Sequence, residues 1–140
     1  MDLSTPLKQQ LVESYPWLFK ELGFQFVYHE YSPKSFGNSF VILKSAVLRV
    51  RVERDRGQVL ADVASANDPE TWWPLVFVLE AIEDKLPAPN FELEAVVSSL
   101  RDNLSGLVEA MGPKYAETKQ ELERRGAERL RRLQPPRTAR

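Results

Sequence analysis

The feature that most constrains the fold is a pair of alternating runs joined by Arg56-Gly57. Residues 46–55 and 58–65 place apolar and polar side chains in turn, which is the two-residue period of a half-buried β-strand. The Arg56-Gly57 pair is typical of a tight hairpin turn, because glycine takes a positive φ at no steric cost. The sequence therefore predicts an antiparallel hairpin over residues 46–65.

A two-residue turn also fixes which residues lie opposite each other. Asp55 pairs with Gln58, and counting outward places Arg51 opposite Asp62. Five apolar side chains then share one face of the hairpin, which we expect to be the core face: Leu48, Val50, Val52, Ala61 and Val63. The other face carries the charges: Arg49, Arg51, Glu53 and Asp62. A slip by one residue would turn the charges into the core, so the pattern specifies this register strongly.

Two more strands are predicted on the N-terminal side of this hairpin, over residues 24–31 and 39–44. If the second of them turns back at Lys44-Ser45, Val41 and Leu43 join the core face. The second face then gains apolar side chains beside its charges: Phe40, Ile42, Val47 and Leu60. We expect this mixed face to be covered by another element or by another molecule.

Helices are predicted before and after the strands in the sequence. Their ranges are residues 4–22 with a kink or split at Pro16, residues 68–85 with Asp68 as the cap, residues 92–111, and residues 114–133. The order α-β-β-β-β-α-α-α predicts an α+β fold, a four-stranded antiparallel meander with helices packed on one face. Residues 1–112 are predicted to form this domain. Residues 113–134 add a charged helix that projects or docks loosely, and residues 135–140 a disordered tail.

Composition bounds the chemistry. The 140 residues are 43% hydrophobic and 28% charged, as in one globular domain that needs no disulfide or metal to hold its core. No cysteine is present and there is one histidine, so no thiolate chemistry, no histidine-based metal site and no cofactor is predicted. The longest apolar stretch, residues 72–79, is interrupted by Pro74 and too short to span a bilayer. The start of the sequence does not read as a secretory signal. We expect a cytoplasmic protein without membrane contact.

Two features are candidates for a catalytic or ligand site. His29 is a candidate general base, since imidazole titrates near neutral pH, yet no G-x-S-x-G motif accompanies it. A lone histidine on a strand is more often an ordinary sheet-surface residue. Residues 32–39 offer donors for a phosphate but lack P-loop spacing and lie between strands, where turn chemistry explains them. No catalytic residue is predicted.

Three further features favour interactions. Trp72 and Trp73 could mark an interface or pack at the core and edge of a helix, where adjacent residues point about 100° apart. Glu83 and Asp84 oppose the dipole of a predicted helix C-terminus, which indicates either a solvated face or recognition of a basic partner. Residues 121–140 carry seven arginines against three glutamates, but the interleaved acids favour a solubilised helix over a nucleic-acid surface.

The run FGNSFVILKSAVLRVRVERDRGQVLADVAS, followed by DPETWWPLVFVLEAI, resembles a recurring kind of small uncharacterised bacterial protein. Some proteins of this size and composition resemble immunity proteins of toxin–immunity systems. The resemblance covers about residues 36–82, includes no catalytic signature and transfers no functional residue.

The sequence therefore predicts a non-catalytic interaction protein that binds a protein partner or a second copy of itself. The most specific form of this hypothesis is an immunity-like protein, in which an acidic corner at Glu83 and Asp84 covers a basic toxin. The possible partner-binding residues are Phe40, Ile42, Val47, Arg49, Arg51, Leu60, Asp62, Trp72, Trp73, Glu83 and Asp84. One alternative is a small enzyme or ligand-binding domain with a pocket between the sheet and the second main helix. The other alternative is nucleic-acid binding through residues 124–132.

Overall fold

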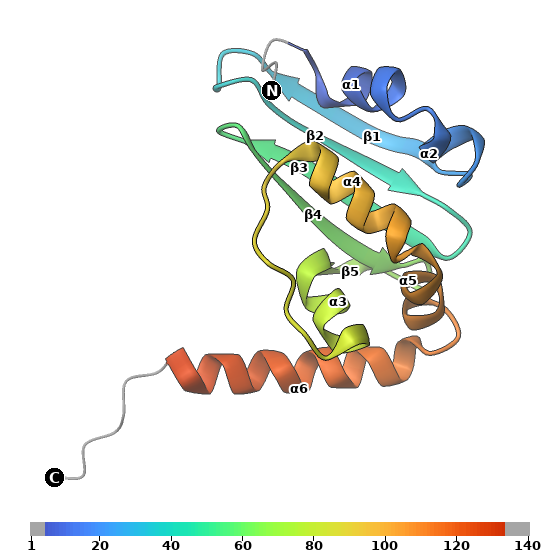
Figure 1. The fold of residues 1–140 in the computed structure, drawn as a ribbon, viewed down its shortest axis with the longest axis vertical. Helices are drawn as coiled ribbons and strands as arrows, with labels where there is room; N and C mark the ends of the chain where they lie inside the picture. Colours follow the sequence, from blue (N-terminus) through green and yellow to red (C-terminus); the bar gives the residue numbers. More distant parts are fainter. Residues whose placement is uncertain (1–4, 134–140) are drawn as a thin grey trace, which may run out of the picture.

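Five consecutive strands pair with their chain neighbours to form one antiparallel sheet in the order β1-β2-β3-β4-β5 (Figure 1). This description rests on a computed structural model that describes residues 5–133; the predicted disordered tail, residues 135–140, lies outside the described residues. The strands are β1 (Gln25–Ser32), β2 (Asn38–Lys44), β3 (Leu48–Asp55), β4 (Gln58–Ser65) and β5 (Asp68–Pro74). The helices are α1 (Leu7–Ser14), α2 (Trp17–Lys20), α3 (Leu75–Glu83), α4 (Leu93–Asp102), α5 (Leu104–Met111) and α6 (Tyr115–Leu133).

The register predicted for the central hairpin is confirmed. Asp55 lies opposite Gln58, and Arg51 lies opposite Asp62. Both turn residues have positive φ, 52° at Arg56 and 83° at Gly57, as a type I′ turn requires. On the neighbouring strand β2, the side chains that follow the same alternation, Val41 and Leu43, are fully buried.

The prediction of four strands is wrong, because the residues read as a helix start form β5 instead. Ala66 and Asn67 make a tight turn, and Ser65 pairs with Asp68 across it. An edge strand tolerates Pro69, since its outward side needs no donor. The β-branched and aromatic side chains that follow favour a strand with one side on the sheet. Pro74 closes β5 and immediately precedes α3.

The helical regions number six among the described residues, because two of the predicted helices are divided. Pro16 separates α1 from α2, as its missing donor predicts. The predicted helix over residues 92–111 is broken at Asn103, whose side-chain amide donates to the carbonyl oxygen of Ser99 at 2.8 Å. This local hydrogen bond competes with the helical backbone, as asparagine side chains commonly do.

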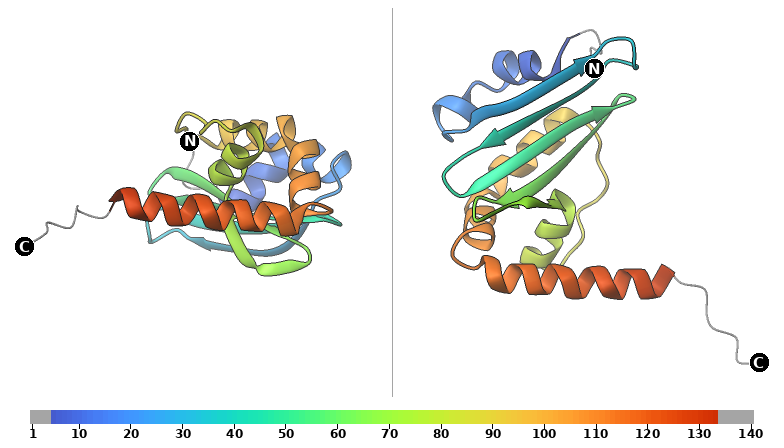
Figure 2. Two further views of the ribbon diagram at one scale, coloured as in Figure 1. Left: turned by 90° about the horizontal axis from the view of Figure 1, so that it is seen from below. Right: turned by 180° about the vertical axis from the view of Figure 1, so that it is seen from behind.

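All the helices from α1 to α5 lie on one face of the sheet, and α6 runs past the β5 edge (Figures 1 and 2). The core lies between this face and the helices. It contains fully buried side chains of β2, β3 and β4, while Phe26 of β1 and Trp73 of β5 pack against it partly buried. The opposite face of β1 to β5 carries no helix in the described part of the chain (Figure 2). We call it the open face.

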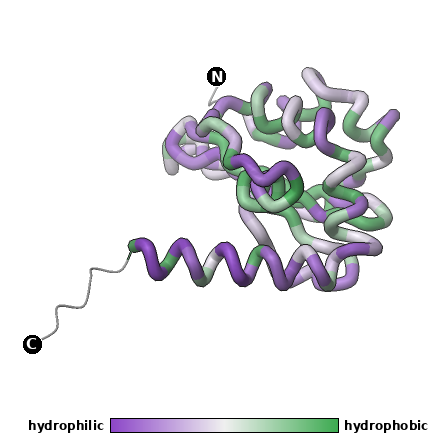
Figure 3. The backbone as a smooth tube through the Cα atoms, turned by 60° about the horizontal axis from the view of Figure 1, so that its bottom comes forward, coloured by the Kyte–Doolittle hydropathy of each residue, from purple (hydrophilic) through white to green (hydrophobic). Residues whose placement is uncertain are grey.

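The prediction that α6 docks loosely is wrong for its first two thirds. The helix is hydrophilic along most of its length (Figure 3). It nevertheless packs against α3 and α5, and its Leu122 side chain is only 2% exposed. Its start is fixed to β5, because Tyr115 donates to Asp68 at 2.6 Å and Lys119 donates to the same carboxylate oxygen at 3.1 Å. Its last turns extend beyond α3, with Leu133 79% exposed.

Candidate functional site

The open face brings together side chains from all five strands. Strand alternation and the observed register place on it Tyr28, Glu30, Phe40, Ile42, Lys44, Arg49, Arg51, Glu53, Asp55, Leu60, Asp62 and Trp72. Of the residues predicted for partner binding, seven lie here: Phe40, Ile42, Arg49, Arg51, Leu60, Asp62 and Trp72. The face is mixed, as predicted, but its apolar and charged side chains alternate across the strands, since Phe40 lies between Glu30 and Glu53.

An ionic cluster forms one part of the open face. Arg51 donates to Asp62 through two nitrogens, at 3.3 and 2.9 Å. The guanidinium carbon of Arg51 lies 4.7 Å from the centre of the Trp72 ring, and that of Arg49 lies 5.4 Å from it. Arg49 also donates to the carbonyl oxygen of Pro69 at 2.9 Å. Cation–π contacts and the ion pair therefore hold these long side chains in one arrangement.

Apolar side chains lie next to the cluster. The rings of Tyr28 and Phe40 are 5.3 Å apart, and Ile42 lies between Tyr28 and Arg51 in the sheet register. Tyr28 is 49% exposed and Leu60 is 46% exposed. Large aromatic and aliphatic groups at this exposure, beside arginine, are typical of interface centres. Tyr28 was missed by the sequence analysis, although counting outward from the β2 register identifies its face.

Four of the predicted residues lie elsewhere. Val47 lies in the β2–β3 turn, close to Gly112 at the end of α5. Trp73 pairs with Val63 on the helical side of the sheet, and its indole donates to Tyr115 at 3.4 Å. Adjacent tryptophans on a strand point to opposite faces, so Trp72 and Trp73 do not line one site. Glu83 and Asp84 lie at the exposed end of α3.

The acidic corner is partly neutralised from within the chain. Asp84 accepts a hydrogen bond from Arg125 at 2.7 Å, and Glu80 accepts one from Arg129 at 3.0 Å. Further along α6, Glu121 accepts from Arg124 and Arg125, and these hydrogen bonds lower the pKa of Glu121 to about 2. Four arginines of α6 therefore pair with acids at the end of α3 and within α6 itself: Arg124, Arg125, Arg129 and Arg132.

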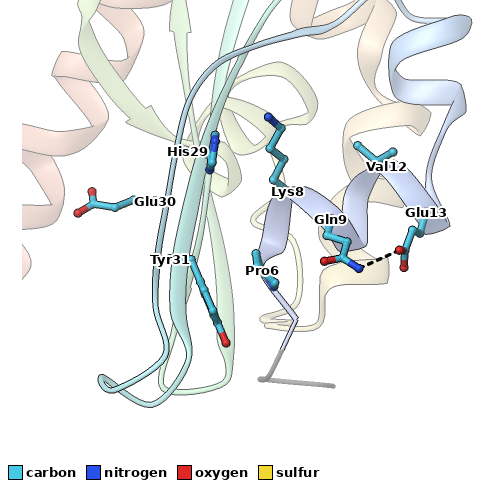
Figure 4. A pocket seen from close by; sticks show the side chains of 8 residues that line it. All are labelled: Pro6, Lys8, Gln9, Val12, Glu13, His29, Glu30 and Tyr31. Atoms are coloured by element: carbon cyan, nitrogen blue, oxygen red, sulfur yellow. Dashed lines mark hydrogen bonds between the residues drawn. The ribbon is translucent and has the colours of Figure 1, made fainter.

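A hollow of about 650 Å³ lies between α1 and β1 (Figure 4). His29 and Tyr31 of β1 face it from one side and Lys8 and Val12 of α1 from the other, while Glu30 points to the opposite side of the strand (Figure 4). Its lining contains no serine, aspartate or cysteine that His29 could activate. The hollow therefore offers apolar contact and several polar groups, of which Gln9 donates to Glu13 at 2.9 Å.

Two polar groups inside the fold were not anticipated. The Arg54 side chain is fully buried and donates to the carbonyl oxygens of Gly37 and Thr5 and to the amide oxygen of Gln10. The Asp68 carboxylate accepts from Tyr115, Thr71 and Lys119, and these hydrogen bonds lower its pKa. Burial raises the pKa of Tyr115, and its hydrogen bond to Asp68 raises it further. Arg54 is buried and Asp68 is partly exposed, and both connect distant segments and so hold the fold together.

The described residues contain no group of three or more histidine or acidic side chains placed to hold a metal ion. No helix among them has the length and apolar character needed to cross a membrane. The fold and surface thus define an α+β protein with an uncovered antiparallel sheet face. No protein-family model matches the chain, and neither the curated proteins nor the solved structures contain a significant match to it.

Proposed function

We propose that this chain is a non-catalytic interaction protein whose open face binds a partner protein. The observation that carries the proposal is the uncovered sheet face itself, on which Tyr28, Leu60 and the Arg51–Trp72 contact lie together. The helices already cover the apolar face of the sheet, and an antiparallel sheet can leave its second face to solvent. Large, half-exposed apolar side chains grouped beside arginines on that second face are what favour a protein partner.

Charge and shape support a protein partner over the alternatives. A nucleic-acid surface through α6 requires free arginines, whereas Arg124, Arg125 and Arg129 are paired with carboxylates. An immunity-like acidic corner is weakened in the same way, because Arg125 already occupies Asp84. The open face keeps the arginine and aromatic side chains that are enriched at interface centres. We expect this interaction to occur in the cytoplasm, as the cysteine-free composition favours a reducing compartment.

A ligand-binding function has one observation in its favour, the hollow between α1 and β1. Its volume lies within the range of small-molecule sites. It differs from the predicted pocket between the sheet and the second main helix, since its lining comes from β1, from α1 and from Pro6 just before α1. We rank it second because its polar groups do not converge on one point (Figure 4).

Site-specific photo-crosslinking in the cells that produce the protein tests the proposal. A photoreactive amino acid replaces Leu60 on the open face, and in a matched strain it replaces Leu130, which is 64% exposed on α6. We expect a discrete adduct from position 60 that disappears when Phe40→Ala is added. Equal labelling from both positions, or no adduct from position 60, would contradict the proposal.

A further inference from the structure

The middle strand of the sheet, β3, carries charges on the open face in an order that complements a second β3 running in the opposite direction. Along β3 the side chains on the open face are, in order, Arg49, Arg51, Glu53 and Asp55. Two positive charges are thus followed by two negative charges at a constant spacing of about 7 Å, twice the rise of a strand. Glu53 and Asp55 are exposed, and neither makes a side-chain hydrogen bond or ion pair within the described residues.

From this pattern we propose that the partner of the open face is a second copy of this chain, bound face to face. The inference rests on the proposed function and names its partner. A two-fold axis that brings two open faces together lies in the plane between the sheets. An axis perpendicular to the strands reverses their direction and keeps their order, so β3 of one copy crosses over β3 of the other.

Placing this axis between Arg51 and Glu53 pairs every charge of β3 with its opposite. Arg51 of each copy meets the partner's Glu53, and Arg49 meets the partner's Asp55. An axis parallel to the strands would set like charges together, so the pattern selects one orientation. The guanidinium of Arg51 has five donors and uses two nitrogens for Asp62, which leaves donors for a second carboxylate.

The same axis brings apolar groups together at the centre. On β2, Phe40 and Ile42 lie at equal distances on either side of it, in register with Glu53 and Arg51. Phe40 of one copy therefore packs on the partner's Ile42, next to the charge pairs. Two sheets in such a sandwich lie about 10 Å apart, a distance that side chains of this size fill.

The size of the face is sufficient for a stable dimer. Five strands at the usual spacing and seven or eight residues in length make a face of roughly 24 by 25 Å. Because side chains project from the sheet, the accessible area of the face is larger than this flat area, on the order of 800 Å². Each partner in an interface of standard size buries about that much.

Charge reversal tests the proposal on the full chain by sedimentation equilibrium. We expect wild type to show twice the 16.1 kDa mass of one chain. Glu53→Arg with Asp55→Arg raises the dissociation constant about a hundredfold or more, because like charges then face each other. Arg49→Glu with Arg51→Glu does the same, and an equal mixture of the two variants restores the dimer. Glu117→Arg with Glu123→Arg, at exposed positions of α6, adds the same positive charge as the first variant away from the open face and leaves the dimer unchanged.

A wild-type chain that stays monomeric at all concentrations overturns the proposal, as does a mixture that fails to associate. If Arg49→Glu with Arg51→Glu does not fold, the variant at Glu53 and Asp55 still decides, since both of those side chains are exposed and unpaired. The crosslink from position 60 distinguishes the proposed dimer from the more general proposal that the open face binds a protein. An adduct of twice the chain mass supports the dimer, an adduct with another protein retains the function but rejects the second copy, and no adduct rejects both.

Discussion

Arg51 and Trp72, 21 positions apart in the chain, stack on the uncovered side of the sheet with the guanidinium carbon 4.7 Å from the ring centre. The contact links β3 to the edge strand β5. The ion pair between Arg51 and Asp62 links β3 to β4, the strand that lies between them. The three strands are thus joined by side chains on a face where no apolar core supports them.

The two adjacent tryptophans are expected to respond differently to truncation. Trp72→Ala removes two cation–π contacts at a partly exposed site and should lower the free energy of unfolding by about 1 kcal/mol. Trp73→Ala removes a side chain packed against the core and should cost about 3 kcal/mol. Urea unfolding measures both. Binding at the open face should weaken only in the Trp72 variant at concentrations where both variants are folded, and equal losses of stability would contradict the assignment of faces.

Replacing the buried guanidinium of Arg54 should destabilise the fold strongly. Arg54→Met keeps much of the volume but leaves the carbonyl oxygens of Gly37 and Thr5 without these donors. We expect a loss of about 3 kcal/mol, since buried acceptors without partners are costly. Arg54→Lys should recover little of it, because an ammonium group cannot span acceptors on three segments. Arg56→Met, at the exposed turn, is the matched control.

Acid should loosen the attachment of α6 to the sheet. The pKa of Asp68 is lowered in the folded state, so the unfolded chain binds a proton first as pH falls. The stability that this carboxylate contributes is complete above its ordinary pKa of about 4 and is lost below that value. The free energy of unfolding should therefore fall between about pH 4 and pH 2 less steeply in Asp68→Asn than in wild type. Parallel pH profiles would show that Asp68 contributes nothing to this dependence.

Alanine substitutions at two glycines are expected to change the stability of the protein in opposite directions. A Cβ added at Gly126 of α6 meets nothing within 4 Å, so Gly126→Ala should stabilise the protein by about 0.5–1 kcal/mol through helix propensity. A Cβ added at Gly112 would lie 2.7 Å from the carbonyl oxygen of Val108 and 2.8 Å from a methyl of Val47. Gly112→Ala should therefore destabilise, as melting temperatures will show. A stable Gly112→Ala would mean that the α5–α6 junction relaxes without cost.

Sequence reasoning succeeded where structure depends on near neighbours. The β3–β4 register follows from a period of two and from a turn that needs positive φ at Gly57, and both signals lie within 20 residues. It failed at Asp68, because a carboxylate followed by proline is favourable at a helix start and equally acceptable on an edge strand. What decides is the pairing of β5 with β4, and Trp73 against Val63 is part of it.

The buried arginine shows the same limit more sharply. Alternation places Arg54 on the core face, yet its partners Gly37, Gln10 and Thr5 lie 17, 44 and 49 positions away. No local pattern connects them. For the candidate site, the sequence identified the composition of the open face, while its uncovered state depends on where six helices pack.

The meander topology also has a consequence for how the chain folds. Every strand pairs with its neighbour in sequence, so the sheet forms from successive hairpins with short loops and a small loss of chain entropy at each step. The contacts of α6 close much longer loops, since Tyr115 and Lys119 reach Asp68 across 47 and 51 positions. We therefore expect the hairpins to form first and docking of the charged helix to complete the native structure.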